Sequence, residues 1–148
     1  MANIVTSTTD YASWHLANRA RVTTRIDALK QAVIDPLRLH GIAAVAIHFD
    51  GYGDSGAVEE VTCRSVDDRE IELPEIAVAG VDDDGQAVQT TLRQALESLA
   101  YAALELHHPG WENNDGAGGA LEIDVADASF ALDCKLRYTA YDDHYTEL

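Results

Sequence analysis

The sequence predicts an α+β fold in which two helices pack on one face of a four- or five-stranded, mainly antiparallel sheet. Two segments carry apolar residues at helical spacing, and two pairs of segments alternate apolar and polar residues as half-buried strands do. Their order along the chain is helix, strand, strand, a candidate short strand, helix, strand, strand. A layer of helices on one face of the sheet is the simplest way to bury both sets of apolar side chains.

Length and composition fit one folded domain. A chain of 148 residues with 47% apolar residues can bury a core of its own. We expect residues 1–9 to be a flexible N-terminus and residues 10–148 to form a single α+β domain. No apolar run reaches the roughly 18 residues of a membrane span, and the first residues lack the pattern of a signal peptide. These observations predict a cytoplasmic protein that does not bind membranes.

The first helix is expected to begin at Asp10 and to end or kink near Asp35, because Pro36 follows. Its apolar stripe has near-helical spacing and comprises Trp14, Val22, Ile26, Leu29 and Val33. Three arginines lie largely off this stripe: Arg19, Arg21 and Arg25. They predict either a solvated basic face or a face that docks on an acidic partner subunit.

The remaining elements follow from periodicity. Alternating runs at 42–49 and 57–64 predict a hairpin around the glycine-rich segment 50–56, and Pro74 restricts the acidic stretch after it to a short edge strand. Helical spacing predicts the second helix from Ala87 to His108, where Pro109-Gly110 ends it. The clearest strand alternation, at 121–125 and 130–138, predicts a second hairpin with its turn near Ala126.

This order brings two unusual loops to one end of the sheet. If the first strand runs upward, the segment 50–56 lies at the top. The second helix then runs upward and finishes at the same end of the sheet. The segment 107–116 and the residues after the last strand, including His144, also lie there.

The two loops also carry a resemblance. FDGYGDSG at 49–56 and HHPGWENNDG at 107–116 resemble the twin signatures of a family of small bacterial proteins of unknown function, often encoded on mobile or accessory DNA. The similarity runs roughly from residue 15 to the C-terminus. It implies that the loops matter, and it brings no activity or cofactor with it.

Ten loop residues are candidates for binding a ligand or partner: Asp50, Tyr52, Asp54, Ser55, His108, Trp111, Glu112, Asn113, Asn114 and Asp115. Four of them offer the oxygen ligands that Ca²⁺, Mg²⁺ and Mn²⁺ prefer, so a divalent metal ion is the candidate cofactor: Asp50, Asp54, Glu112 and Asp115. His107, His108 and His144 would extend the choice to zinc or iron. The structural alternative is that the acids and amides form turns and that Trp111 covers the core.

No complete catalytic set is visible. The string Gly53-Asp54-Ser55-Gly56 also surrounds the nucleophile of chymotrypsin-like proteases, but this chain is too short for their double barrel. Cys63 and Cys134 lie in strand-like runs, which predicts two buried thiols rather than a disulfide and makes both poor nucleophiles.

Charge is the strongest global feature. There are 26 acidic and 10 basic residues, a net charge of −16; residues 1–48 hold five bases and three acids, whereas the remainder holds five bases and 23 acids. Such a field repels nucleic acids and membranes and attracts basic partners, although it could also serve solubility alone. The basic first helix against the acidic remainder would suit a homo-oligomer.

Two functions fit these observations. The first is a small acidic binding or regulatory protein that engages the basic surface of a protein partner through the segments 50–56 and 107–116. Its sharper form is an inhibitor from a mobile element that mimics nucleic-acid charge. The second is a small enzyme or ligand-binding protein, such as a metal-dependent hydrolase, with a carboxylate and histidine site between the same loops. The missing catalytic set favours the first.

Overall fold

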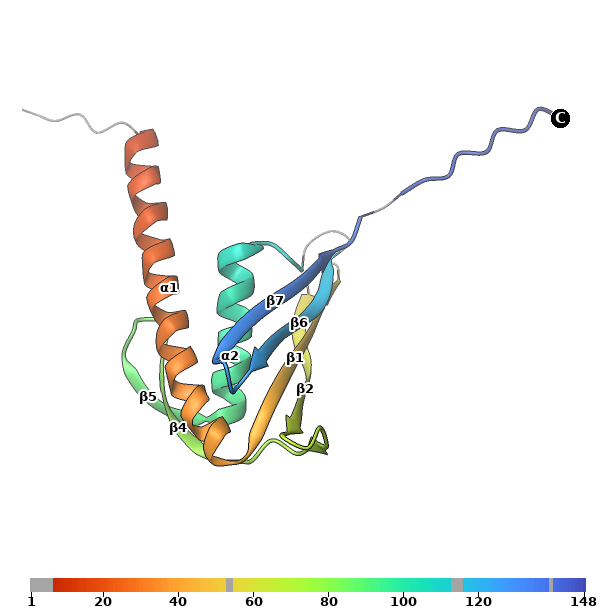
Figure 1. Ribbon diagram of the computed structural model, residues 1–148. Helices are drawn as coiled ribbons and strands as arrows, with labels where there is room; N and C mark the ends of the chain where they lie inside the picture. Colours follow the sequence, from red (N-terminus) through yellow and green to blue (C-terminus); the bar gives the residue numbers. More distant parts are fainter. Residues whose placement is uncertain (1–6, 53–54, 113–115, 139) are drawn as a thin grey trace, which may run out of the picture.

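The computed structural model describes residues 7–52, 55–112, 116–138 and 140–148, and shows two helices beside an antiparallel sheet (Figure 1). The elements in chain order are α1 (Ser7–Leu39), β1 (Ile42–Tyr52), β2 (Ser55–Ser65), β3 (Glu70–Ile71), β4 (Ala77–Val81), β5 (Ala87–Thr91), α2 (Leu92–His107), β6 (Ala117–Asp124) and β7 (Ser129–Leu136). The main sheet has five strands in the order β3-β2-β1-β6-β7, while β4 and β5 form a separate two-stranded sheet. The predicted α+β class is confirmed.

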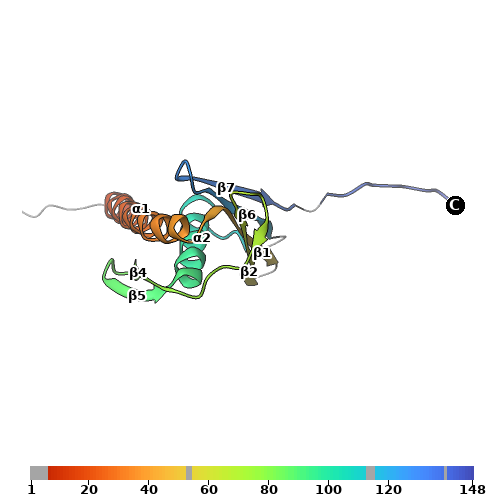
Figure 2. The same cartoon turned by 60° about the horizontal axis from the view of Figure 1, so that its bottom comes forward.

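Both helices lie on the same side of the main sheet (Figures 1 and 2). Alternate residues of β1 point toward them and are buried, as Val45 and Ile47 show. From the helices, the fully buried side chains include Leu29, Val33, Leu37, Leu92, Leu96 and Leu99. Because burying one such aliphatic side chain contributes about 1.5–3 kcal/mol, this layer supplies most of the driving force for folding.

The helix α1 does not end at Asp35 as the sequence suggested. It continues through Pro36 to Leu39, and the carbonyl of Pro36 still accepts a bond from the amide of His40 at 3.1 Å. Leu37 is fully buried beyond the proline, so tertiary packing outweighs the lost amide of Pro36.

The N-terminal half of α1 projects beyond the rest of the domain (Figure 1). Trp14, placed on the apolar stripe from its spacing, is 61% exposed. The stripe becomes buried only from Ile26 onward, where α2 and the sheet provide a surface to pack against.

The second helix is shorter than its periodicity suggested. Residues Ala87–Thr91 form β5, which pairs antiparallel with β4, and α2 begins at Leu92. The hydroxyl oxygen of Thr91 caps α2 by accepting a bond from the amide of Gln94 at 3.1 Å. Val88, which fits helical spacing, lies instead on this small sheet and is 37% exposed.

The expected short edge strand is divided in two. Glu70–Ile71 forms β3 at the edge of the main sheet, and Ala77–Val81 forms β4 of the small sheet. Pro74 lies in the irregular stretch between them, because it has no amide to donate to a strand ladder.

The second face of the main sheet is not covered by any described helix or strand, and we call it the open face. By strand register it carries small side chains at its centre, namely Ala44, Ala46 and Ala120. Charged side chains surround them: Asp50, Glu60, Arg64, Glu70, Glu122, Asp124, Asp133, Lys135 and Arg137. None of the described helices is both long and apolar enough to cross a membrane.

Candidate functional site

The two unusual loops come together at one end of the sheet. The first continues the β1–β2 hairpin, whose last described pair is Tyr52 opposite Ser55. The second leads from α2 into β6, and Ala117 at the start of β6 pairs with Gly51. The convergence of these loops, predicted from element order, is therefore present in the described residues that flank them.

Trp111 is the centre of this contact. Its side chain is only 8% exposed, and it forms a second apolar cluster with Phe49, Leu104 and Ala117. The rings of Trp111 and Phe49 meet edge to face, with centroids 5.5 Å apart. Trp111 thus covers the core, as the structural alternative predicted, and presents no free indole face as a ligand platform.

Two glycines of the first loop make room for the indole. A Cβ atom placed on Gly51 would lie 2.6 Å from Cζ3 of Trp111, and one placed on Gly56 would lie 2.5 Å from Cη2. Both distances are far below van der Waals contact, so side chains at 51 and 56 would displace the ring. Close packing therefore explains Gly51 and Gly56, whereas Gly53 lies outside the described residues.

Arg137 joins the first loop to the end of β7, and sequence reasoning missed it. One guanidinium nitrogen pairs with Oδ1 of Asp50, and another donates to the carbonyl of Gly51 at 2.9 Å. The backbone amide of Arg137 donates to the carbonyl of Gly116 at 2.9 Å. A Cβ atom on Gly118 would lie 2.7 Å from the guanidinium and 3.1 Å from Oδ1 of Asp50, so a larger residue there would have to displace this ion pair.

The other predicted residues have different places. His108 caps α2 through its backbone: its amide donates to Leu104 at 2.7 Å, and its carbonyl accepts from Trp111 at 3.0 Å. Glu112 is half-buried, with its Cβ beside Gly56. Tyr52 and Ser55 are described by their backbone alone, and four predicted residues lie outside the described part of the chain: Asp54, Asn113, Asn114 and Asp115.

The remaining histidines do not join the two loops. His107 is an exposed residue in the last turn of α2. His144 lies on the C-terminal segment, pairs with Asp142 at 3.1 Å and is largely exposed. That segment starts at the predicted end of the sheet but runs away from it (Figure 1).

A shallow depression of about 730 Å³ lies beside Asp50 on the open face, and a second of about 550 Å³ continues along the same face. The first is lined by His48, Asp50, Glu122, Asp133, Lys135 and Arg137, among others. The second has a floor of Ala44 and Ala46. Together they form a broad trough with a small-residue floor and charged walls, adjacent to the loops.

Metal binding draws no support from the described residues, which contain no cluster of three or more His, Cys, Asp or Glu side chains suited to an ion. Of the four predicted ligands, Asp50 is paired with Arg137, Glu112 is half-buried, and Asp54 and Asp115 are outside the described part of the chain.

Both cysteines are free thiols. They lie on β2 and β7 with β1 and β6 between them, so three strand spacings of about 4.8 Å put them at least about 14 Å apart, too far for a disulfide. Burial raises the pKa of the Cys63 thiol, partly opposed by Arg93, and burial together with Asp133 raises the pKa of Cys134. Raised pKa values leave little thiolate at neutral pH and make both cysteines weak nucleophiles.

Comparison with known proteins gives a family and no function. The sequence model of a family of unknown function, DUF6878, matches residues 26–148, which include both loops and the whole main sheet. No curated protein and no solved structure matches the chain.

Proposed function

The chain belongs to this family of unknown function, and from its own geometry we propose that it is a small acidic binding or regulatory protein that engages a basic surface of a protein partner. The proposed contact surface combines the two loops, at 50–56 and 107–116, with the adjoining open face. The observation that carries the proposal is the uncovered trough of small residues, bordered by carboxylates, beside the described residues of the two loops.

The shape of this surface supports protein binding. A sheet face with alanine at its centre is flat enough to accept another protein's side chains, and the trough is broad and shallow rather than enclosed. Small-molecule sites usually bury most of their ligand in a deeper cleft. Trp111 and the pair between Asp50 and Arg137 already fix described residues of both loops, which lowers the cost of ordering them on contact.

The charge supports a basic partner. The open face carries six carboxylates and three basic side chains, and the whole chain carries a net charge of −16. Complementary charge accelerates association and makes it sensitive to salt. An inhibitor that mimics nucleic-acid charge is the sharper form of this function. The cytoplasm is the compartment we propose, since both cysteines are free.

The catalytic alternative has less support. An enzyme site between the loops would need several polar groups directed into one cavity, but Trp111 is part of the core and Asp50 is held by Arg137. Of the candidate carboxylates and histidines that the structure describes, none is seen to converge with another on a cavity between the loops.

The test is affinity capture from cells that encode the protein, with substitutions on the proposed surface. Ala46→Arg would place a long cation at the centre of the trough, and Glu112→Lys would reverse a charge at the loops. The matched control is Gln89→Arg, at an exposed position of β5 away from this surface. We expect a partner that is captured by the wild type and the control, is lost from both surface variants, and elutes as salt rises from about 0.05 to 0.5 M. Retention by both surface variants would reject the proposed surface.

A further inference from the structure

We propose that the chain self-associates, with the C-terminal segment of one copy, residues 138–148, docking on α1 of a second copy. The contact uses a different surface from the one proposed for the protein partner, so the two proposals stand or fall separately. It rests on an exposed acidic and aromatic segment and on a face of α1 that carries the exposed Trp14 and Arg21, whose guanidinium is bonded to Asn18 and is in no described ion pair.

The C-terminal segment has the residue pattern of an amphipathic helix, although its described residues, 138 and 140–148, form neither helix nor strand. Its large apolar side chains are almost fully exposed, from 84% upward: Tyr138, Tyr141, Tyr145 and Leu148. Their spacings of three, four and three residues would bring all four within an arc of about 80° on a helix. An isolated helix of this length is unstable in water, so the segment would become helical only on contact with a partner.

The receiving surface is one face of α1. At about 100° per residue, Trp14, Ala17, Asn18, Arg21 and Arg25 lie within an arc of about 100°. Trp14 is 61% exposed at the projecting end of this face. Arg21 is exposed and bonded to Asn18 at 2.7 Å, while Arg25 is partly buried against Asp83 at 3.3 Å. The face therefore offers an aromatic ring and a guanidinium to a partner.

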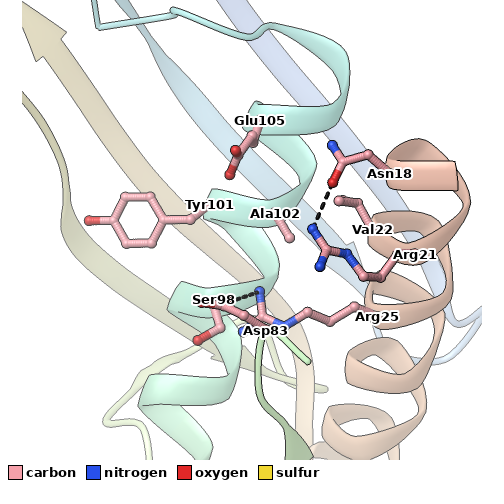
Figure 3. Close-up of a pocket in the computed structure, with 9 residues that line it drawn as sticks. All are labelled: Asn18, Arg21, Val22, Arg25, Asp83, Ser98, Tyr101, Ala102 and Glu105. Carbon is pink, nitrogen blue, oxygen red and sulfur yellow. Dashed lines mark hydrogen bonds and ion pairs between the residues drawn. The ribbon is translucent and has the colours of Figure 1, made fainter. Parts of the chain in front are cut away.

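A pocket of about 400 Å³ between α1 and α2 continues this face (Figure 3). Val22 and Ala102 lie between the two helices and provide apolar contact, while Arg21 and Arg25 extend from α1. Glu105 stands on the α2 side and Asp83 pairs with Arg25, so an acidic segment would be favoured beside Arg21. An apolar side chain such as Leu148 or a tyrosine would fit the floor.

Complementary charge indicates that the C-terminal segment is what docks on this face of α1. On the helix formed by residues 138–148, Asp142, Asp143 and Glu147 fall largely outside the apolar arc, where they would meet the arginines of α1. Within one copy, α1 and the C-terminal segment lie on opposite sides of the domain, with α2 and the sheet between them (Figures 1 and 2). A second copy presents its α1 without that obstacle, and a reciprocal exchange would give a symmetric dimer.

The first experiment measures molar mass against concentration by sedimentation, for the full chain and for a chain truncated after Arg137. This truncation retains the pair between Arg137 and Asp50. We expect the full chain to form a dimer and the truncated chain to stay monomeric. A full chain that stays monomeric up to about 100 µM, or a dimer that survives truncation, would overturn the proposal. A segment that folds back on its own chain would give the first of these results.

Point variants then locate the contact. We expect Trp14→Ala and Arg21→Glu each to raise the dimer dissociation constant about tenfold or more. The matched controls, Val66→Ala and Arg69→Glu, change exposed residues near β3 and should leave it unchanged. Mixing Arg21→Glu chains with chains carrying Asp142→Arg and Asp143→Arg should restore association. Equal effects of the variants and their controls would refute docking on α1.

Discussion

The contact between Trp111 and the glycines of the first loop is the most constrained feature at the scale of single residues. The indole fills space that a Cβ atom at position 51 or 56 would occupy. Phe49 fixes the ring from the side, and the backbone of His108 fixes it from the preceding turn. These contacts depend on one another, so a substitution at one of these residues should disturb the packing of its neighbours.

Substituting Gly56 by alanine should therefore destabilise the fold. We expect Gly56→Ala to lower the free energy of unfolding by about 1–3 kcal/mol, the usual cost of overpacking, as measured by urea denaturation. In a Trp111→Phe background the shorter ring leaves the crowded space, so the same substitution should cost less. An equal cost in both backgrounds would show that the indole is not the cause.

Arg137 performs two tasks that a double-mutant cycle can separate. Its pair with Asp50 is about half exposed, so the coupling between the two residues should be at most about 1 kcal/mol and should fall with salt. Its bond to the carbonyl of Gly51 does not involve Asp50. We expect Arg137→Ala still to cost about 1 kcal/mol in an Asp50→Asn background, measured by urea denaturation. No residual cost would mean that the ion pair is its whole contribution.

At the scale of elements, the start of α2 depends on the small sheet before it. Thr91 is the last residue of β5 and also the N-cap of α2. The amide of Leu92 donates to the carbonyl of Ile76 at 2.9 Å, which ties the helix start to the segment before β4. The hairpin of β4 and β5 therefore sets where α2 begins.

Removing the cap should destabilise the protein by about 1 kcal/mol. We expect this loss in Thr91→Ala, because the amide of Gln94 loses its side-chain acceptor. The control is Thr23→Ala, an exposed threonine inside α1, where alanine has the higher helix propensity. Thermal unfolding of both variants checks the prediction, and equal melting temperatures would contradict the capping role.

The sequence predicted those elements whose pattern is local. Strands with alternating residues and the helix around Leu96 were found, and so was the meeting of the two loops. The start of α2 was missed because Val88 fits both helical spacing and a short strand. Arg137 was missed because its partner Asp50 is 87 residues away, and no local pattern encodes that contact. The glycines were interpreted as turn residues, whereas the indole that requires them comes from the other loop.

At the scale of the whole molecule, the charges are arranged as unevenly in space as in the sequence. Three arginines lie on the first 25 residues, on or near the projecting half of α1, while acids dominate the sheet and the C-terminal segment. The described ion pairs engage few of the acids, and most of those pairs are exposed. Repulsion among the remaining carboxylates should therefore oppose the compact state.

Added salt should for this reason stabilise the protein. Raising KCl from about 0.02 to 0.3 M shortens the screening length from about 20 to 6 Å, which weakens repulsion between separated carboxylates. We expect the free energy of unfolding to rise by about 1 kcal/mol and the melting temperature by a few degrees. A matched variant replaces three exposed acids, Glu59, Glu72 and Glu75, by lysine and changes the net charge from −16 to −10, since each substitution adds two charge units. For this variant, a smaller rise in the free energy of unfolding with salt would confirm that net charge is the cause. An unchanged rise would mean that salt acts on the hydrophobic core instead.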